Sequence, residues 1–172
     1  MENKPTAPWL IALITSLALI VFNLVLYVTD LMMEKKMSYF STALLMGVII
    51  WACIHYAKQM NGQVTFGNVF SHGFKVTAGI AAIMSVYTFI AIKFIHPELL
   101  EKTLDQARAE MEKNPDLNAD AIDMGLSITR KFFLPMALAF SLFGTAIMGA
   151  IASLIGAGVA KKNPITPFEN AG

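Results

Sequence analysis

Residues 9–29 read WLIALITSLALIVFNLVLYVT, a stretch that contains no charged side chain. In helical form such a stretch crosses the hydrocarbon core of a bilayer, which is about 30 Å thick and needs about 20 apolar residues. A removable signal peptide would have a basic start, a shorter apolar region and a small-residue cleavage site. Here bulky residues stand where cleavage would fall, so the pattern favours a retained first span.

Three further apolar runs follow, and the composition of the whole chain is typical of a membrane protein. Hydrophobic residues make up 56% of it and charged residues 15%, against roughly 45–50% and about 25% in soluble domains. The sequence therefore predicts an all-α fold, an integral membrane bundle of four transmembrane helices. It forms a single membrane domain over residues 1–172, with spans at about residues 9–29, 38–57, 74–95 and 132–160.

The segment before the third span has its own pattern. Thr65 is placed to cap a helix, and Phe66, Phe70 and Phe74 then recur every fourth residue, which puts three rings on one helical face. A helix with its rings on one side and polar groups on the other is typical of the membrane interface. We expect an interfacial helix here that turns at Gly73 into the span.

Asn68, His72 and Lys75 fall together on another face of that segment and form a candidate polar entrance. Ionisable groups at membrane depth suggest a substrate path or an ion site. At the end of a span, however, such side chains snorkel to the headgroups, so anchoring is the favoured interpretation for Lys75, His72 and His55.

Between the third and fourth spans, residues 97–131 form a charged insert. Two helical stretches are predicted, separated by Asn114-Pro115, with the second beginning near Asn118. Each carries a narrow apolar stripe that we expect to meet the membrane surface or another protein: Leu100, Leu104, Ala107 and Met111 in the first, and Ile122, Leu126 and Thr129 in the second.

The fourth span should begin at Phe132 with Pro135 in its first turn. Its later half carries two ridges of small residues, which are candidate helix-packing positions because they let backbones approach closely. The ridges serve either packing inside one bundle, which we favour, or homodimerisation. They consist of Gly149, Ser153 and Ala157, and of Ala152, Gly156 and Ala160.

Several classes of function are disfavoured by what the sequence contains. A net charge of +1 without a basic cluster argues against a nucleic-acid partner. His55, His72 and His96 match no metal-ligand spacing, and no cofactor-binding or catalytic signature is present. Cys53 lies inside a span, where a thiol behaves as a small apolar side chain. We therefore expect no metal, no cofactor and no enzyme activity.

Particular residues also give the chain a resemblance to a known family. They are GQVTFGNVFSHGF at residues 62–74, the tripeptide HPE at residues 96–98, and KKNP at residues 161–164 after the Gly/Ala-rich last span. In these motifs and in the order of its spans the chain resembles the domain of unknown function 4199 family. Its members are small membrane proteins, mainly of Bacteroidetes-type bacteria, which implies a cytoplasmic (inner) membrane location. The resemblance implies no activity or site residue.

Two functional hypotheses remain at this point. The first is a non-enzymatic scaffold or accessory protein, whose insert docks on a membrane-protein partner or on the lipid bilayer. The second is a small transporter or channel, acting alone or as a homodimer, with Asn68, His72 and Lys75 at its entrance. Because Lys161-Lys162 abuts the last span, we expect both termini on the cytoplasmic side.

Overall fold

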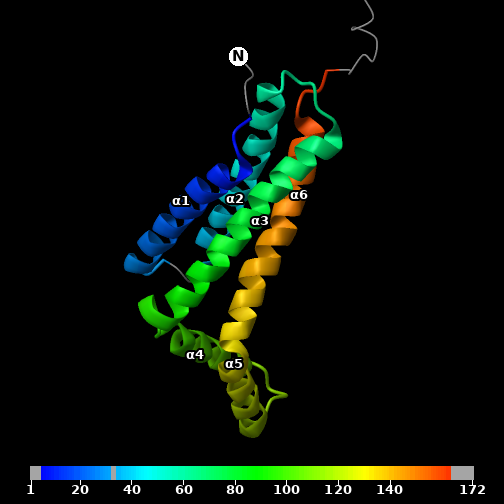
Figure 1. The fold of residues 1–172 in the computed structure, drawn as a ribbon. Coiled ribbons are helices and arrows are strands. Elements are labelled where there is room, and N and C mark those ends of the chain that lie inside the picture. The colour runs from blue at the N-terminus through cyan, green and yellow to red at the C-terminus, as the bar shows by residue number, and fades with distance from the viewer. Residues whose placement is uncertain (1–4, 32–33, 164–172) are drawn as a thin grey trace, which may run out of the picture. The chain divides into compact units, whose positions relative to one another are not determined.

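The computed structural model describes residues 5–31 and 34–163, apart from the side chain of Lys35, and these residues form helices and no strand. Figure 1 shows their order along the chain. The helices are α1 (Pro8–Val28), α2 (Lys35–Gln59), α3 (Phe66–Ile90), α4 (Leu99–Met111), α5 (Ala119–Ala139) and α6 (Thr145–Val159). Two π-helical turns interrupt this pattern, η1 (Ala91–Ile95) after α3 and η2 (Phe140–Gly144) between α5 and α6.

Within the described residues, four helical stretches are long and apolar enough to cross a membrane. They are Pro8–Val28, Lys36–Gln59, Phe66–Ile95 and Ala119–Val159. The all-α, four-span prediction is therefore confirmed, and the chain is a multi-pass membrane protein.

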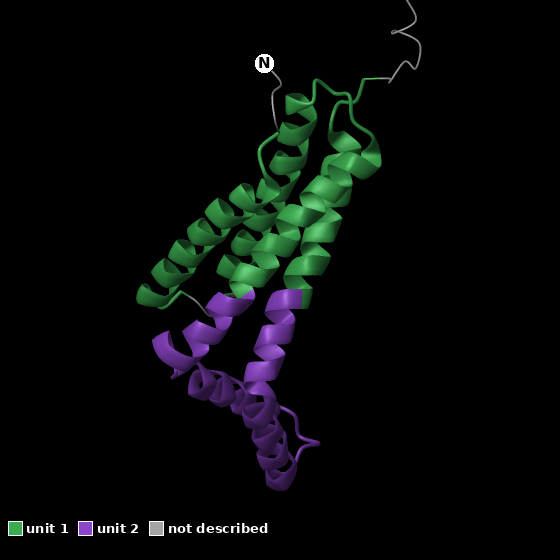
Figure 2. Ribbon diagram, in the orientation of Figure 1, with its two compact units in different colours: residues 1–84, 143–172 green, residues 85–142 purple. Residues whose placement is uncertain are grey.

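The described residues group into two compact units, whereas the sequence suggests a single membrane domain (Figure 2). Unit 1 takes its residues from 1–84 and 143–172, and unit 2 takes residues 85–142. Unit 1 holds α1, α2, most of α3 and α6, and unit 2 holds α4 and α5. The long helices that begin at Phe66 and Ala119 contribute residues to both units.

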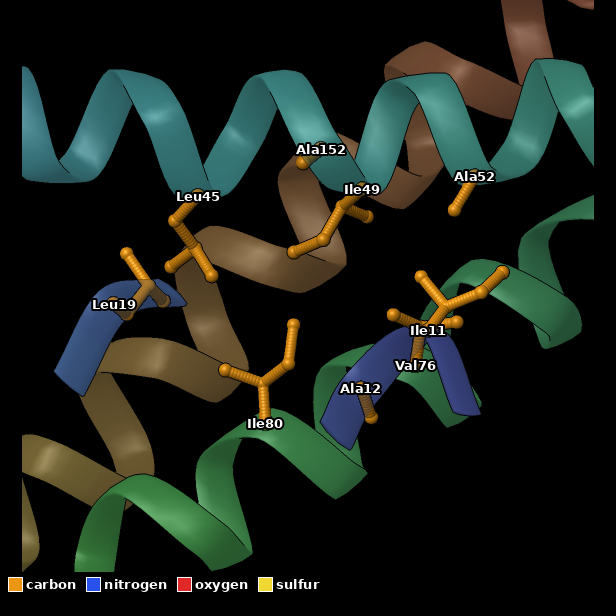
Figure 3. Close-up of a cluster of buried hydrophobic side chains, with 9 residues drawn as sticks. All are labelled: Ile11, Ala12, Leu19, Leu45, Ile49, Ala52, Val76, Ile80 and Ala152. Atoms are coloured by element: carbon orange, nitrogen blue, oxygen red, sulfur yellow. The ribbon is translucent and has the colours of Figure 1, made fainter. Parts of the chain in front are cut away.

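Side chains from four helices meet in the main core of unit 1. Figure 3 shows Ile11 and Leu19 of α1, Ile49 of α2, Ile80 of α3 and their neighbours turned toward one another. Ile49 and Ile80 are fully buried. Since lipid is as apolar as these side chains, close packing and not the hydrophobic effect holds such helices together.

The ends of α1 and α2 are closed by the same backbone motif. Asp30 and Asn61 each adopt a left-handed conformation, with φ of 53° in both cases. The N–H of the following residue then bonds back to a carbonyl five residues earlier, Leu31 to Leu26 at 2.9 Å and Gly62 to Ala57 at 2.8 Å. These bonds satisfy helix-end carbonyls that would otherwise stay unpaired, as in a Schellman cap.

The start of α3 differs in part from expectation. Thr65 does cap the helix, because its Oγ1 accepts a hydrogen bond from the N–H of Asn68 at 3.2 Å. The expected separate interfacial helix is wrong, however, because α3 continues from Phe66 to Ile90 without a turn at Gly73. Gly73 is instead a close-approach position, since a Cβ there would overlap the sulfur of Cys53 and the hydroxyl of Ser153. Packing thus offsets the low helix propensity of this glycine.

Pro135 also lies elsewhere than expected, inside α5 and not in the first turn of a helix. The helix begins at Ala119, after the N-cap Asn118, whose side-chain oxygen accepts a hydrogen bond from the N–H of Ala121 at 2.8 Å, and it runs past Phe132 without interruption. An interior proline removes one backbone bond and crowds the carbonyl four residues earlier. Membrane helices tolerate this where π-type adjustments re-satisfy the backbone, and η2 begins five residues later at Phe140.

The predicted stripes of the insert pack against each other in unit 2. Leu104 of α4 is buried together with Ile122 and Leu126 of α5. Leu100, Ala107 and Met111 pack on this cluster, and the guanidinium groups of Arg108 and Arg130 reach Asp123 and Glu101 at 3.0 and 2.8 Å. The expectation that both stripes need an outside partner is therefore wrong. A helix in the same insert supplies the apolar surface that each requires.

Candidate functional site

The residues of the candidate polar entrance occupy different environments on α3. Asn68 and Lys75 are exposed, whereas His72 is buried. The imidazole of His72 stacks on the ring of Tyr56 in α2, with 4.3 Å between centroids and 13° between planes. This histidine therefore contributes to packing between α2 and α3, and it does not share an open polar surface with the other two residues.

The small-residue ridges of α6 lie at the tightest helix contact in unit 1. All six candidate positions, Gly149, Ala152, Ser153, Gly156, Ala157 and Ala160, are buried. A Cβ on Gly149 would overlap the side chain of Thr77 in α3, and one on Gly156 would come within 2.7 Å of the Cβ of Cys53 in α2. The ridges are thus filled by α2 and α3 of the same chain.

Cys53 sits where these three helices converge. Its sulfur lies 3.7 Å from the carbonyl oxygen of Val69 and 4.0 Å from that of Ser153. The hydroxyls of Ser153 and Thr77 donate to carbonyls of their own helices, those of Gly149 at 2.7 Å and Gly73 at 3.0 Å. The polar atoms here are therefore satisfied locally, and the contact is structural.

The sequence reasoning missed a pocket whose lining is apolar in the larger part and polar in the rest. It lies in unit 1, has a volume of about 160 Å³, and is lined in part by Asn23 of α1, Ser41 and Thr42 of α2, and Thr145 of α6. The hydroxyls of Ser41 and Thr42 donate to carbonyls one turn earlier in α2, each at 3.0 Å. Four separated polar residues in otherwise apolar runs are the only sequence signal for it, and their convergence required the fold.

The three histidines lie in different environments. His55 stacks on Trp51, with 4.9 Å between centroids, His72 stacks on Tyr56, and His96 is fully buried in unit 2. Over residues 5–31 and 34–163, no group of three or more His, Cys, Asp or Glu side chains is arranged to hold a metal ion.

Unit 2 presents an apolar surface that the sequence reasoning also overlooked. Met124, Ile128 and Phe132, which we call the outer stripe of α5, are 66%, 52% and 46% exposed. Their four-residue spacing places them on one helical face, away from Ile122 and Leu126, which face α4. The spacing was visible in the sequence, but only the packing of α4 shows which of the two apolar faces of α5 remains uncovered.

Comparison with known proteins gives one match. Residues 10–162 match the family described as protein of unknown function (DUF4199). No curated protein and no solved structure matches the chain.

Proposed function

Because the chain belongs to the DUF4199 family, which carries no established activity, we propose a function from its own surfaces: a non-enzymatic membrane scaffold or accessory protein. Its docking element is the hairpin of α4 and the first part of α5. The observation that carries this proposal is the exposed outer stripe of α5. A helix with two apolar faces, one of them uncovered, is typical of a segment that meets a second surface.

The charge of the hairpin favours a protein partner over the lipid surface. Residues 97–131 carry eight acidic and five basic side chains. An anionic membrane surface attracts basic segments and repels acidic ones. A partner that fits would offer an apolar groove for the outer stripe with Lys or Arg side chains at its rim.

The hairpin is also held together by its own packing and by a helix cap, as expected of a preformed docking element. The buried cluster around Leu104 fixes α4 against α5, and the Asn118 cap fixes the start of α5. A surface that is ordered before binding loses less conformational entropy on association. Its partner would therefore recognise α5 as a helix in a groove.

Site-specific photocross-linking in native membranes tests this proposal. A photoreactive residue replaces Ile128 of the outer stripe in one variant and Ser127, which is also exposed but lies on another face, in a control. We expect a discrete cross-linked protein from position 128 only, and its loss when Met124→Glu is added. Equal products from both positions, or none from either, would contradict the proposal, and a product with a second copy of the chain would contradict a heterologous partner.

A transporter remains the second candidate, and the polar residues that line part of the pocket in unit 1 are the observation that favours it. Solute paths through helical bundles are lined by hydrogen-bonding side chains, and Asn23 and Thr145 supply such groups. Reconstituted liposomes test this function directly. A flux of ions or small solutes that Asn23→Leu abolishes would support transport, whereas wild-type liposomes without flux would remove it.

We also propose that both termini face the cytoplasm, across a bacterial inner membrane. The observation that supports this orientation is that Lys58 lies at the end of α2 and that Lys161 and Lys162 follow α6, since cytoplasmic segments are enriched in basic residues. Labelling of intact cells by a membrane-impermeant thiol reagent tests it. A cysteine introduced at Asn61 should be protected and one at Asp116 labelled, and the reverse pattern would overturn the orientation.

A further inference from the structure

A groove between α1 and α2 opens on the outer surface of unit 1. Its volume is about 350 Å³, and its lining includes Ile14 and Ala18 of α1 with Leu44, Val48, Trp51 and His55 of α2. Ile14 and Trp51 are more than half exposed. In a membrane-spanning segment such exposed apolar side chains face hydrocarbon, so the groove fills from the bilayer.

One end of the groove is polar and is held in place by a pair of hydrogen bonds. The N–H of Thr6, which also lines the groove, donates to Oε1 of Gln59 at 2.9 Å, and Nε2 of Gln59 donates to Oγ1 of Thr6 at 2.8 Å. His55 stacks on Trp51 just inside this end. Lys58 follows His55 by three residues on the same side of α2, and its side chain is exposed.

The charges of unit 1 are segregated along these two helices. Among its described residues the acidic side chains are Asp30 and Glu34, and both lie in the turn that joins α1 to α2. The polar end of the groove is at the opposite end of both helices, since Thr6 precedes α1 and Gln59 ends α2. No carboxylate among the described residues of unit 1 lies at that end, and the exposed ammonium group of Lys58 can attract an anion from the headgroup layer.

We propose that this groove is a binding site for an anionic phospholipid. One acyl chain lies along Ala18, Val48 and Trp51, and the negatively charged headgroup sits beside Lys58 at the polar end. The apolar lining accounts for the acyl chain, and the exposed lysine accounts for the charge of the headgroup. The site is separate from the hairpin of unit 2, and it stands whether or not that hairpin docks a partner.

Fluorescence quenching by brominated lipids tests the proposal, because Trp51 lines the groove and the chain has two tryptophans. A Trp9→Phe variant leaves Trp51 as the sole indole. The full chain is reconstituted in vesicles of phosphatidylcholine with increasing fractions of brominated phosphatidylglycerol, and in the reverse mixture. We expect the anionic lipid to bind beside Trp51 several-fold more tightly than the zwitterionic one.

Two variants with matched controls separate the headgroup from the chain. Lys58→Gln should reduce the preference for the anionic lipid about fivefold, the effect expected of one lysine near an anionic surface, while Lys93→Gln, an exposed lysine of unit 2, leaves it unchanged. Ala18→Phe, which fills the groove, should also abolish the preference, while Ala43→Phe on an exposed part of α2 should not.

Three results would overturn the proposal. Equal quenching of Trp51 by both lipids in the wild-type groove would show that any lipid binds there without selection. An unchanged preference after Lys58→Gln and Ala18→Phe would place the lipid elsewhere. Protection of Trp51 from every brominated lipid would show that a protein helix covers the groove.

Discussion

The two units pack their own helices together with different kinds of residue, unit 1 at the contact of α2, α3 and α6 and unit 2 in its hairpin. In unit 1, Gly73, Gly149 and Gly156 allow backbones to approach until another side chain occupies the place of their absent Cβ. In unit 2, leucine and isoleucine side chains fill the space and ion pairs flank them. Small residues suit helices that share a lipid solvent, whereas water rewards the burial of large apolar side chains.

The largest effect is expected from a substitution that disrupts the small-residue contact of α2, α3 and α6. Gly149→Leu should destabilise unit 1 by about 3 kcal/mol or more, because the new side chain overlaps Thr77 and the close-packed helices cannot yield. Unfolding of the purified protein in mixed detergent micelles measures this. Gly158→Leu on the same helix, where a Cβ meets nothing within 4 Å, is the control, and equal losses for both would contradict tight packing at Gly149.

A cavity in the hairpin should cost somewhat less. Leu104→Ala removes the buried side chain that α4 contributes to the cluster of unit 2, and we expect a loss of about 2 kcal/mol. Amide hydrogen exchange checks the result, with faster exchange in α4 and α5. Leu117→Ala, at a position 38% exposed, should have little effect. Unchanged protection in Leu104→Ala would mean that the two helices are not held by this cluster.

A third substitution tests the contribution of the N-cap of α5, which is a local helix signal and does not depend on packing between helices. Asn118→Ala should cost about 1 kcal/mol, since the N–H of Ala121 loses its acceptor. The change should appear as faster amide exchange in the first turn of α5. Asn118→Ser keeps an acceptor at the same place and should retain the protection, so an identical loss in both variants would argue against capping.

The smallest effect concerns the ion pairs of the hairpin. Arg108 and Asp123 are 51% and 66% exposed, so their coupling should be below about 1 kcal/mol. A double-mutant cycle with Arg108→Ala and Asp123→Ala measures it, and salt should reduce it further. A coupling of several kcal/mol that survives high salt would mean that the pair is far better shielded from solvent than its exposure indicates.

The lengths of the apolar runs account for most of what was predicted correctly about the fold. The four spans, the Thr65 cap and the helix start near Asn118 could be read from the sequence, because each depends on neighbouring residues. Pro135 and Gly73 were misplaced for the opposite reason. A proline is usually found in the first turn of a helix and a glycine at a turn, and only contacts or backbone adjustments elsewhere in the fold show why these two lie inside helices.

The candidate sites were less accessible to sequence reasoning. The ridge of α6 was visible as a spacing, but its occupants, Thr77 and Cys53, come from distant parts of the chain. The groove near Trp51 has no sequence pattern, since residues of two helices line it together. Surfaces made by pairs of helices therefore need the structure, even where each helix is predicted well.

The burial of Cys53 makes the reactivity of its thiol a measure of whether the helices around it are packed together. The thiol is enclosed by α2, α3 and α6, so a reagent reaches the sulfur only after those helices separate. The rate at which the thiol of the unmodified chain is alkylated would consequently report how often these helices separate transiently, without any engineered label.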